Sequence, residues 1–209
     1  MAVFLLPMVS MADPVDVQFT GVGGSLGISD PGPGGTQYYI SPYTLLVGGT
    51  SENAYCIDFN HDITIGQTWK AYETPVAGLP TGLGNTYLGD QTKYLQMGYL
   101  VSIYNLDPKN SQQAIWDLSV GNTSLFPSSG LTIGLYSDAQ SPGHYNSWDT
   151  TGWYILSDVN SQGRAQEFLF HDSNLTLPPV ATPEPGTMML LGIGMVGVVS
   201  FMRKKLIKS

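Results

Sequence analysis

The alternation of apolar and polar residues predicts a chain that is mainly β. Apolar and polar side chains alternate over residues 15–20, which is typical of a half-buried strand. A Gly/Pro-rich loop is expected at residues 21–35. Runs rich in aromatic and β-branched residues predict further strands at residues 38–47, 54–59, 64–76, 152–156 and 165–170.

The middle of the chain has a helical pattern instead. Asp90 is a suitable N-cap for a helix over residues 92–104, which is apolar on most sides. Pro108 suits the first position of a second helix, which Gly121 would end. The fold class expected is therefore α+β: a mainly antiparallel β-sandwich or barrel with a two-helix insertion.

The N-terminal residues have the composition of an export signal. An apolar run leads into a small-x-small pattern at Ser10 and Ala12, so cleavage after Ala12 is plausible. The usual positive charges before the run are missing, and residues 1–12 are therefore interpreted as a truncated signal peptide. The alternative is a buried N-terminal strand.

The C-terminal end predicts a membrane segment with basic residues behind it. Residues 188–202 form an apolar stretch of fifteen residues, short against the roughly 20 of an ordinary spanning helix. Arg203, Lys204 and Lys205 follow directly and would keep the C-terminus in the cytoplasm. We therefore expect a single transmembrane helix over residues 187–202; a buried core helix is the alternative.

The motif Pro183-Glu184-Pro185, the short apolar helix and the basic tail together resemble a PEP-CTERM sorting signal over residues 182–209. The resemblance implies sorting by an exosortase, a membrane-embedded transpeptidase-like enzyme of bacteria with outer membranes and exopolysaccharide. It implies residence in the inner membrane before processing, then the cell surface or extracellular matrix. Residues 13–174 would form the ectodomain and residues 175–181 a linker.

Charge and cysteine content narrow the remaining choices. The chain has 16 acidic and 8 basic residues, a net charge of −8, so it offers no basic surface for nucleic acid. The single cysteine, Cys56, excludes an internal disulfide. A free thiol in an exported protein risks oxidation, so it should be protected or used. The alternatives are a small buried hydrophobe or an accidental free thiol.

The second candidate residue is Gln112, in the second predicted helix. Ile115 and Trp116 follow it at i+3 and i+4, so Gln112 shares their face. If that face is buried, each unsatisfied group of the carboxamide costs about 1–3 kcal/mol. Attack of a thiol on the carboxamide carbonyl expels ammonia, leaves a thioester and removes the amino group. An ordinary core glutamine is the alternative.

The motifs around Cys56 and Gln112 resemble the Cys–Gln thioester domains of bacterial surface adhesins, over about residues 54–120. Ser111 stands where that family usually has threonine. The resemblance implies covalent bonding to an amine on a surface protein or an amino sugar. Tyr55 and Trp116 are expected to shield the bond from water.

The sequence contains little evidence for other functions. The alternative to an adhesin is a purely structural matrix or surface β-protein without a reactive bond. No constellation of residues indicates a hydrolase, so the protein is not expected to be an enzyme, and no cofactor is predicted. Residues 58–62 begin like a calcium loop, but Ile63 replaces the required glycine, so no metal site is predicted.

Overall fold

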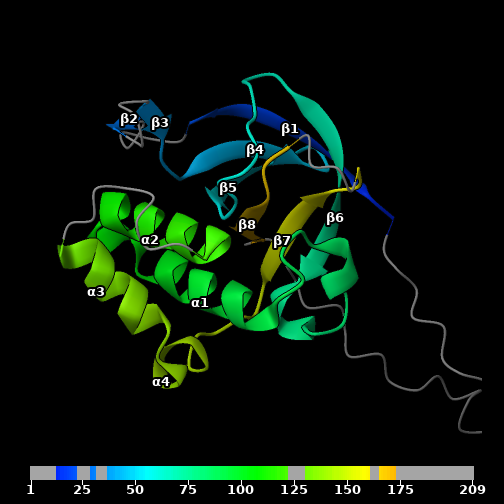
Figure 1. Cartoon of the computed structure of the whole chain (residues 1–209). Coiled ribbons are helices and arrows are strands. Elements are labelled where there is room, and N and C mark those ends of the chain that lie inside the picture. Colours follow the sequence, from blue (N-terminus) through cyan, green and yellow to red (C-terminus); the bar gives the residue numbers. More distant parts are fainter. Residues whose placement is uncertain (1–12, 23–28, 32–36, 122–129, 161–164, 173–209) are drawn as a thin grey trace, which may run out of the picture. The chain divides into compact units, whose positions relative to one another are not determined.

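The core of the fold is a closed, six-stranded antiparallel barrel (Figure 1). The computed structural model describes residues 13–22, 29–31, 37–121, 130–160 and 165–172. Around the barrel the strands follow the order β1 (Val15–Val22), β4 (Tyr43–Val47), β5 (Thr50–Cys56), β8 (Phe168–His171), β7 (Trp153–Asp158) and β6 (Thr68–Pro75). Pairing of β1 with both β4 and β6 closes the barrel.

The barrel interior is filled by side chains that alternate along each strand. Val17 and Phe19 of β1 and Leu45 of β4 are almost completely buried there. Aromatic rings contribute much of the volume, for example Tyr43 against Phe168 with ring centroids 5.6 Å apart. The alternation predicted for residues 15–20 is thus the alternation between barrel interior and exterior.

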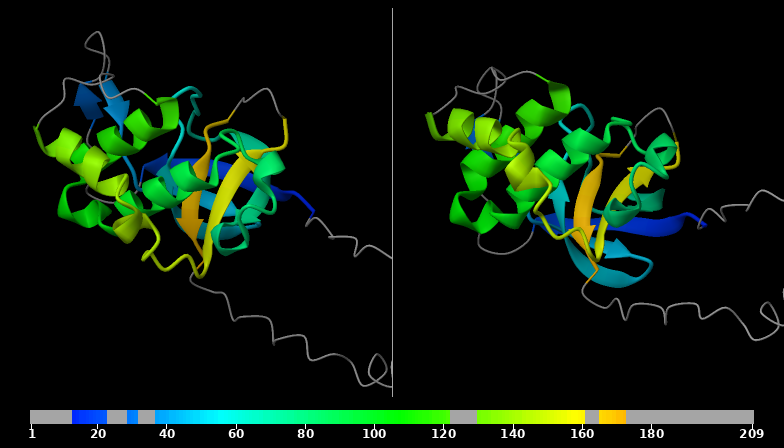
Figure 2. Two further views of the ribbon diagram at one scale, coloured as in Figure 1. Left: turned by 60° about the horizontal axis from the view of Figure 1, so that its bottom comes forward. Right: turned by 90° about the horizontal axis from the view of Figure 1, so that it is seen from below.

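The helices gather on one side of the barrel, as all three ribbon views show (Figures 1 and 2). They are α1 (Gln91–Ser102), α2 (Pro108–Val120), α3 (Gly130–Ala139) and the one-turn α4 (Pro142–Tyr145). Two further strands, β2 (Ser29–Pro31) and β3 (Gln37–Tyr39), pair with each other. The remaining described elements are three short 3-10 turns: Val76–Gly78, Leu83–Asn85 and Tyr104–Leu106.

Capping residues set the ends of the two central helices. The Asp90 carboxylate accepts hydrogen bonds from the backbone N–H groups of Thr92 and Lys93 at the start of α1. Asp107 caps α2 through the N–H of Asn110, and Gly121 ends it with a left-handed φ of 69°. Helix α2 is buried along most of its length, because α1, α3 and the barrel surround it.

A second apolar cluster joins the helices to the outer face of the barrel. Ile155 of β7 and Leu169 of β8 point away from the interior and pack against helical residues such as Met97 and Leu100 of α1. One side of the barrel is therefore covered by protein, and its strands are apolar on both faces there.

The structure confirms an antiparallel β fold with helices and corrects several details. The choice between sandwich and barrel resolves to a barrel. The predicted insertion of two helices contained too few helices, because α3 and α4 follow α2. The strand expected over residues 38–47 divides into β3 and β4, and the Gly/Pro-rich loop contains β2. No helix among the described residues is long and apolar enough to cross a membrane; the predicted segments 1–12, 175–181 and 187–202 lie outside them.

One prediction concerns Gly98, where α1 passes against Trp148. A β-carbon at this position would collide with the indole ring. We expect Gly98→Ala to lower the free energy of unfolding by about 1–3 kcal/mol through overpacking, despite alanine's better helix propensity. Urea unfolding of the two proteins measures the difference.

The matched control is Gly134→Ala, in α3. A β-carbon there meets no atom within 4 Å, and the residue is exposed. Helix propensity alone then applies, and the variant should gain up to about 1 kcal/mol. Equal effects of the two substitutions would contradict the close packing of α1 on Trp148.

Candidate functional site

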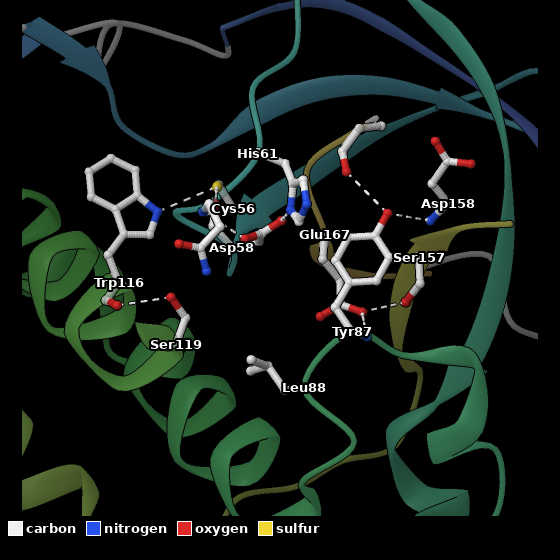
Figure 3. A network of polar contacts seen from close by, with 12 residues as sticks. Cys56, Asp58, His61, Tyr87, Leu88, Trp116, Ser119, Ser157, Asp158 and Glu167 are labelled. Carbon is white, nitrogen blue, oxygen red and sulfur yellow. Dashed lines mark hydrogen bonds and ion pairs between the residues drawn. The ribbon is translucent and has the colours of Figure 1, made fainter. Parts of the chain in front are cut away.

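Cys56 lies at the last position of β5, with its side chain in the barrel interior and none of its surface exposed. Its Sγ–H donates to the backbone carbonyl of Asp58 over 3.1 Å. The indole N–H of Trp116 approaches the sulfur to 3.4 Å (Figure 3). The thiol is therefore enclosed by a helix on one side and by the chain that leaves β5 on the other.

Gln112 lies on α2 and is also fully buried. Its Nε2 donates to the backbone carbonyl of Cys56 over 2.8 Å. Its Oε1 accepts two hydrogen bonds, from the backbone N–H of Ser41 at 3.2 Å and from the hydroxyl of Tyr104 at 3.0 Å. The two residues singled out in the sequence, 56 positions apart, thus lie together in the fold.

Two further residues complete this arrangement, and no sequence pattern pointed to either of them. Ser41 contributes two polar groups: its backbone N–H donates to Gln112 Oε1, and its Oγ accepts from the N–H of Cys56 at 2.8 Å. Tyr104 is fully buried just after α1. Ser41 precedes β4, so only the closed fold brings the two residues to the same carboxamide.

The surroundings of the thiol keep it protonated. Burial raises the pKa of Cys56 to about 12, and the hydrogen bonds with Trp116 and Asp58 only partly offset this effect. At neutral pH the group is a thiol rather than a thiolate. It can act as a nucleophile only if its proton is transferred as a new bond forms.

The two residues expected to shield the site differ in position. Trp116 is 2% exposed and contacts the sulfur directly, with Phe59 against its ring at 5.4 Å between centroids. Tyr55 is half-buried on the opposite face of β5 and packs on the ring of Tyr104 at 5.1 Å. Trp116 thus covers the thiol, whereas Tyr55 lies behind a residue that binds the carboxamide.

The arrangement has the parts of an acyl-transfer site. Two donors converge on the Gln112 carbonyl oxygen, where negative charge develops when a nucleophile adds to the carbonyl carbon. The same carboxamide donates a hydrogen bond to the backbone carbonyl of Cys56, the residue that carries the thiol. The site is enclosed, so competing water is excluded.

A second buried polar group, Glu167, lies beside this site (Figure 3). Its Oε1 accepts from the backbone N–H of Tyr87 at 2.9 Å and from the hydroxyl of Ser157, and its Oε2 accepts from the hydroxyl of Tyr94 at 2.7 Å. Glu167 is fully buried, and burial raises its pKa to about 7. The carboxyl group ties α1 and the loop before it to the barrel.

The calcium-like segment after β5 forms a local turn. The Asp58 carboxylate accepts from the N–H of Asn60 at 2.8 Å and pairs with the ring of His61. Within the described residues, no group of three or more His, Cys, Asp or Glu side chains is placed to hold a metal ion.

Comparison with known proteins identifies the C-terminal signal. A family model described as the PEP-CTERM protein-sorting motif matches residues 181–204. The chain therefore carries the C-terminal, membrane-anchored sorting signal of an exported protein, and an exosortase is its processing partner. The prediction of a PEP-CTERM sorting signal at residues 182–209 is therefore confirmed. Its motif residues, Pro183, Glu184, Pro185, Arg203, Lys204 and Lys205, lie outside the described residues.

Outside the sorting signal, these comparisons found no match for the chain. No curated protein matches the chain. No solved structure matches it either. The resemblance of residues 54–120 to thioester domains is therefore not supported by these comparisons, and the role of Cys56 and Gln112 stays a prediction.

The buried Glu167 leads to a prediction of pH dependence. Its pKa is about 7 in the folded protein against 4.5 ordinarily, so the folded state holds a proton that the unfolded state releases between these values. The stability of the wild type should fall as pH rises through this window. Glu167→Gln cannot ionise, and its destabilisation relative to wild type should be larger near about pH 5 than near about pH 8.

Urea unfolding at the two pH values measures this difference. A loss of stability that is the same at both would show that Glu167 ionises in the folded protein as it does in water.

Proposed function

We propose that this protein is an exosortase-sorted surface or extracellular-matrix protein whose barrel domain bonds covalently to amines through a Cys56–Gln112 thioester. The observation that carries the proposal is the Gln112 carboxamide. It is buried, its Nε2 donates a hydrogen bond to the backbone carbonyl of Cys56, and its carbonyl oxygen accepts from two donors. The protein would be a single-use binder rather than a turnover enzyme.

Formation of the bond needs no other reactant. The Cys56 sulfur adds to Cδ of Gln112, and the thiol proton moves to Nε2. The Cδ–Nε2 bond then breaks, and ammonia leaves. Negative charge on Oε1 during this step is stabilised by the Ser41 N–H and the Tyr104 hydroxyl, which are already directed at that oxygen.

Transfer to a target follows the same path with a different nucleophile. The nitrogen of a primary amine adds to Cδ, the Cδ–Sγ bond breaks, and a proton of the amine returns to the sulfur. The products are an amide at residue 112 and a free Cys56 thiol. The high pKa of the buried thiol would make it a poor leaving group without protonation, so the proton transfer is part of the step.

The charge of the protein is consistent with an amine-bearing target. The chain has 16 acidic against 8 basic residues, and amines are cationic at neutral pH. Long-range attraction would then speed the encounter and weaken as salt is added. The sorting signal supports delivery to the outside of the cell, where such targets on other surfaces are accessible.

A structural role is the second candidate, and one observation favours it. Both polar atoms of the Gln112 side chain already have hydrogen-bond partners, so the residue can stabilise the joint between α2 and the barrel without reacting. The protein would then be a structural surface or matrix component with a protected thiol.

Intact mass distinguishes the two candidates. We expect the purified protein to weigh less than its sequence by the mass of one ammonia, and its Cys56 thiol to resist alkylation after denaturation. Methylamine should add its own mass and release the thiol. Cys56→Ser and Gln112→Glu should each have full sequence mass and form no adduct. A wild-type protein with full sequence mass and a thiol that labels on unfolding would leave only the structural role.

The oxyanion donors provide a second prediction. Tyr104→Phe removes one of the two donors to Gln112 Oε1. We expect thioester formation, followed by mass after refolding, to slow by about 10²–10³-fold, as for loss of one donor from an oxyanion hole. The matched control is Tyr94→Phe, which removes another buried tyrosine hydroxyl, bonded to Glu167 instead. Equal rates in the two variants would contradict a role for Tyr104 in the chemistry.

A further inference from the structure

The Cys56–Gln112 site is closed to solvent. Neither residue has any exposed surface. The side chains around them are buried as well: Ser41 and Tyr104 are 0% exposed, and Trp116 is 2% exposed. A target amine can therefore reach Cδ of Gln112 only if part of this cover moves.

Most of the cover cannot move without damage to the site. On the barrel side Cys56 pairs with Phe168, so an opening there would separate β5 from β8. Ser41 and Tyr104 are the two donors to the carbonyl oxygen, and displacing either would remove the stabilisation of developing charge. Trp116 differs, because its indole N–H donates to the thiol sulfur over 3.4 Å. Sulfur is a weak acceptor, so little is lost when this contact breaks.

Two aromatic rings cover Trp116 in turn. The ring of Tyr38 lies 6.0 Å from the indole and that of Phe59 lies 5.4 Å from it, and the two rings are 5.4 Å apart between centroids. Tyr38 and Phe59 are half-buried, whereas Trp116 is buried, so they form the outer layer. From solvent inward the order is these two rings, then the indole, then the Cys56 sulfur (Figure 3 shows the last step).

The strand that carries Tyr38 can move separately from the barrel. Among the described strands, β3 and β2 form a small sheet of their own (Figure 1), so their displacement breaks no ladder of the barrel. The chain is held just after Tyr38: the carbonyl of Tyr39 accepts from the hydroxyl of Tyr43 at 2.5 Å, and Ile40 is 2% exposed. Ser41 follows directly, so its N–H can stay on the carboxamide while Tyr38 moves.

We propose that Tyr38 and Phe59 form a gate over Trp116, and that outward displacement of Tyr38 admits the target amine to the Cys56–Gln112 site. When the gate is closed, the rings exclude water, which would otherwise hydrolyse a thioester. When it is open, the indole can turn away from the sulfur. The barrel ladder and both oxyanion donors then remain in place.

The gate also selects the shape of the amine. The nitrogen has to pass the layer of Tyr38 and Phe59 and then the position of Trp116. A nitrogen at the end of an unbranched carbon chain can do so while the rest of its molecule stays outside. A nitrogen attached directly to a ring has to bring the ring with it. This selection deepens the function proposed above, and rests on it, because it names the form of amine that the site accepts.

The test measures rates of adduct formation by intact mass on the full chain. Butylamine and cyclohexylamine carry the same group on a straight chain and on a ring, and a small thioester in solution gives their intrinsic reactivities. Relative to that reference, we expect the wild type to favour butylamine about tenfold. Tyr38→Ala loses two ring contacts and should react about tenfold faster with butylamine. Its rate with cyclohexylamine should rise further, so that the preference falls.

Three control variants separate the gate from other effects. Tyr39→Ala removes the neighbouring ring, which is 57% exposed, and keeps the carbonyl that binds Tyr43. Tyr38→Phe keeps the ring that covers Trp116. Both should react at wild-type rates. Gly98→Ala lowers stability in α1, away from these rings, and should leave the preference between the two amines unchanged.

The gate is overturned if Tyr38→Ala leaves both rates unchanged, if Tyr39→Ala accelerates them equally, or if Gly98→Ala does so at a comparable loss of stability in urea. Equal normalised rates of the two amines with the wild type would overturn the selection by shape.

Failure of the proposed function has a different signature. The wild type would then have full sequence mass, and no amine would add to any variant, so the selection among amines fails with it. The gate is then judged from alkylation of the free Cys56 thiol by iodoacetamide in the native protein. Tyr38→Ala should accelerate this reaction about tenfold and Tyr39→Ala should not. Equal alkylation rates in the two variants would overturn the gate as well.

Discussion

The burial of one carboxamide determines how the helices join the barrel. Gln112 lies at the contact between α2 and β5, and it is satisfied only by groups from three separate segments, Ser41, Cys56 and Tyr104. Each group left unsatisfied would cost about 1–3 kcal/mol. Rotation or sliding of α2 by one residue would break all three bonds at once. The register of the helical layer on the barrel, and with it the position of Trp116 over the thiol, follows from this requirement.

The sequence predicted local elements well, and the physical reasons are visible in the structure. Residues 15–20 alternate because β1 has one face inside the barrel, and the caps Asp90 and Asp107 lie where the helices begin. Barrel closure depends on pairing β1 with β6, far along the chain, which no local pattern encodes. Helix α3 was missed because its apolar residues do not form one buried face: Leu131 is 64% exposed.

The candidate site was predictable only in part. Cys56 and Gln112 could be chosen from their chemistry and from the apolar residues that follow Gln112 on the helix. Ser41 could not be chosen in this way, because its bond to Gln112 comes from a backbone N–H that any residue other than proline would also carry. Glu167 was not singled out either, since an acidic residue beside a strand is normally exposed. Its three hydrogen-bond donors come from elements that only the tertiary structure assembles.

The place of β8 in the barrel has a mechanical consequence. It is the last described strand before the sorting signal and lies between β5 and β7, paired with both along its length. A barrel bound to a target and pulled through its C-terminal end, in the direction of β8, would carry tension along that strand. The ladders on both sides would then be loaded in shear, with their hydrogen bonds sharing the force rather than opening one by one. Cys56 pairs with Phe168 in one of these ladders, so the site lies where a pulled barrel resists extension.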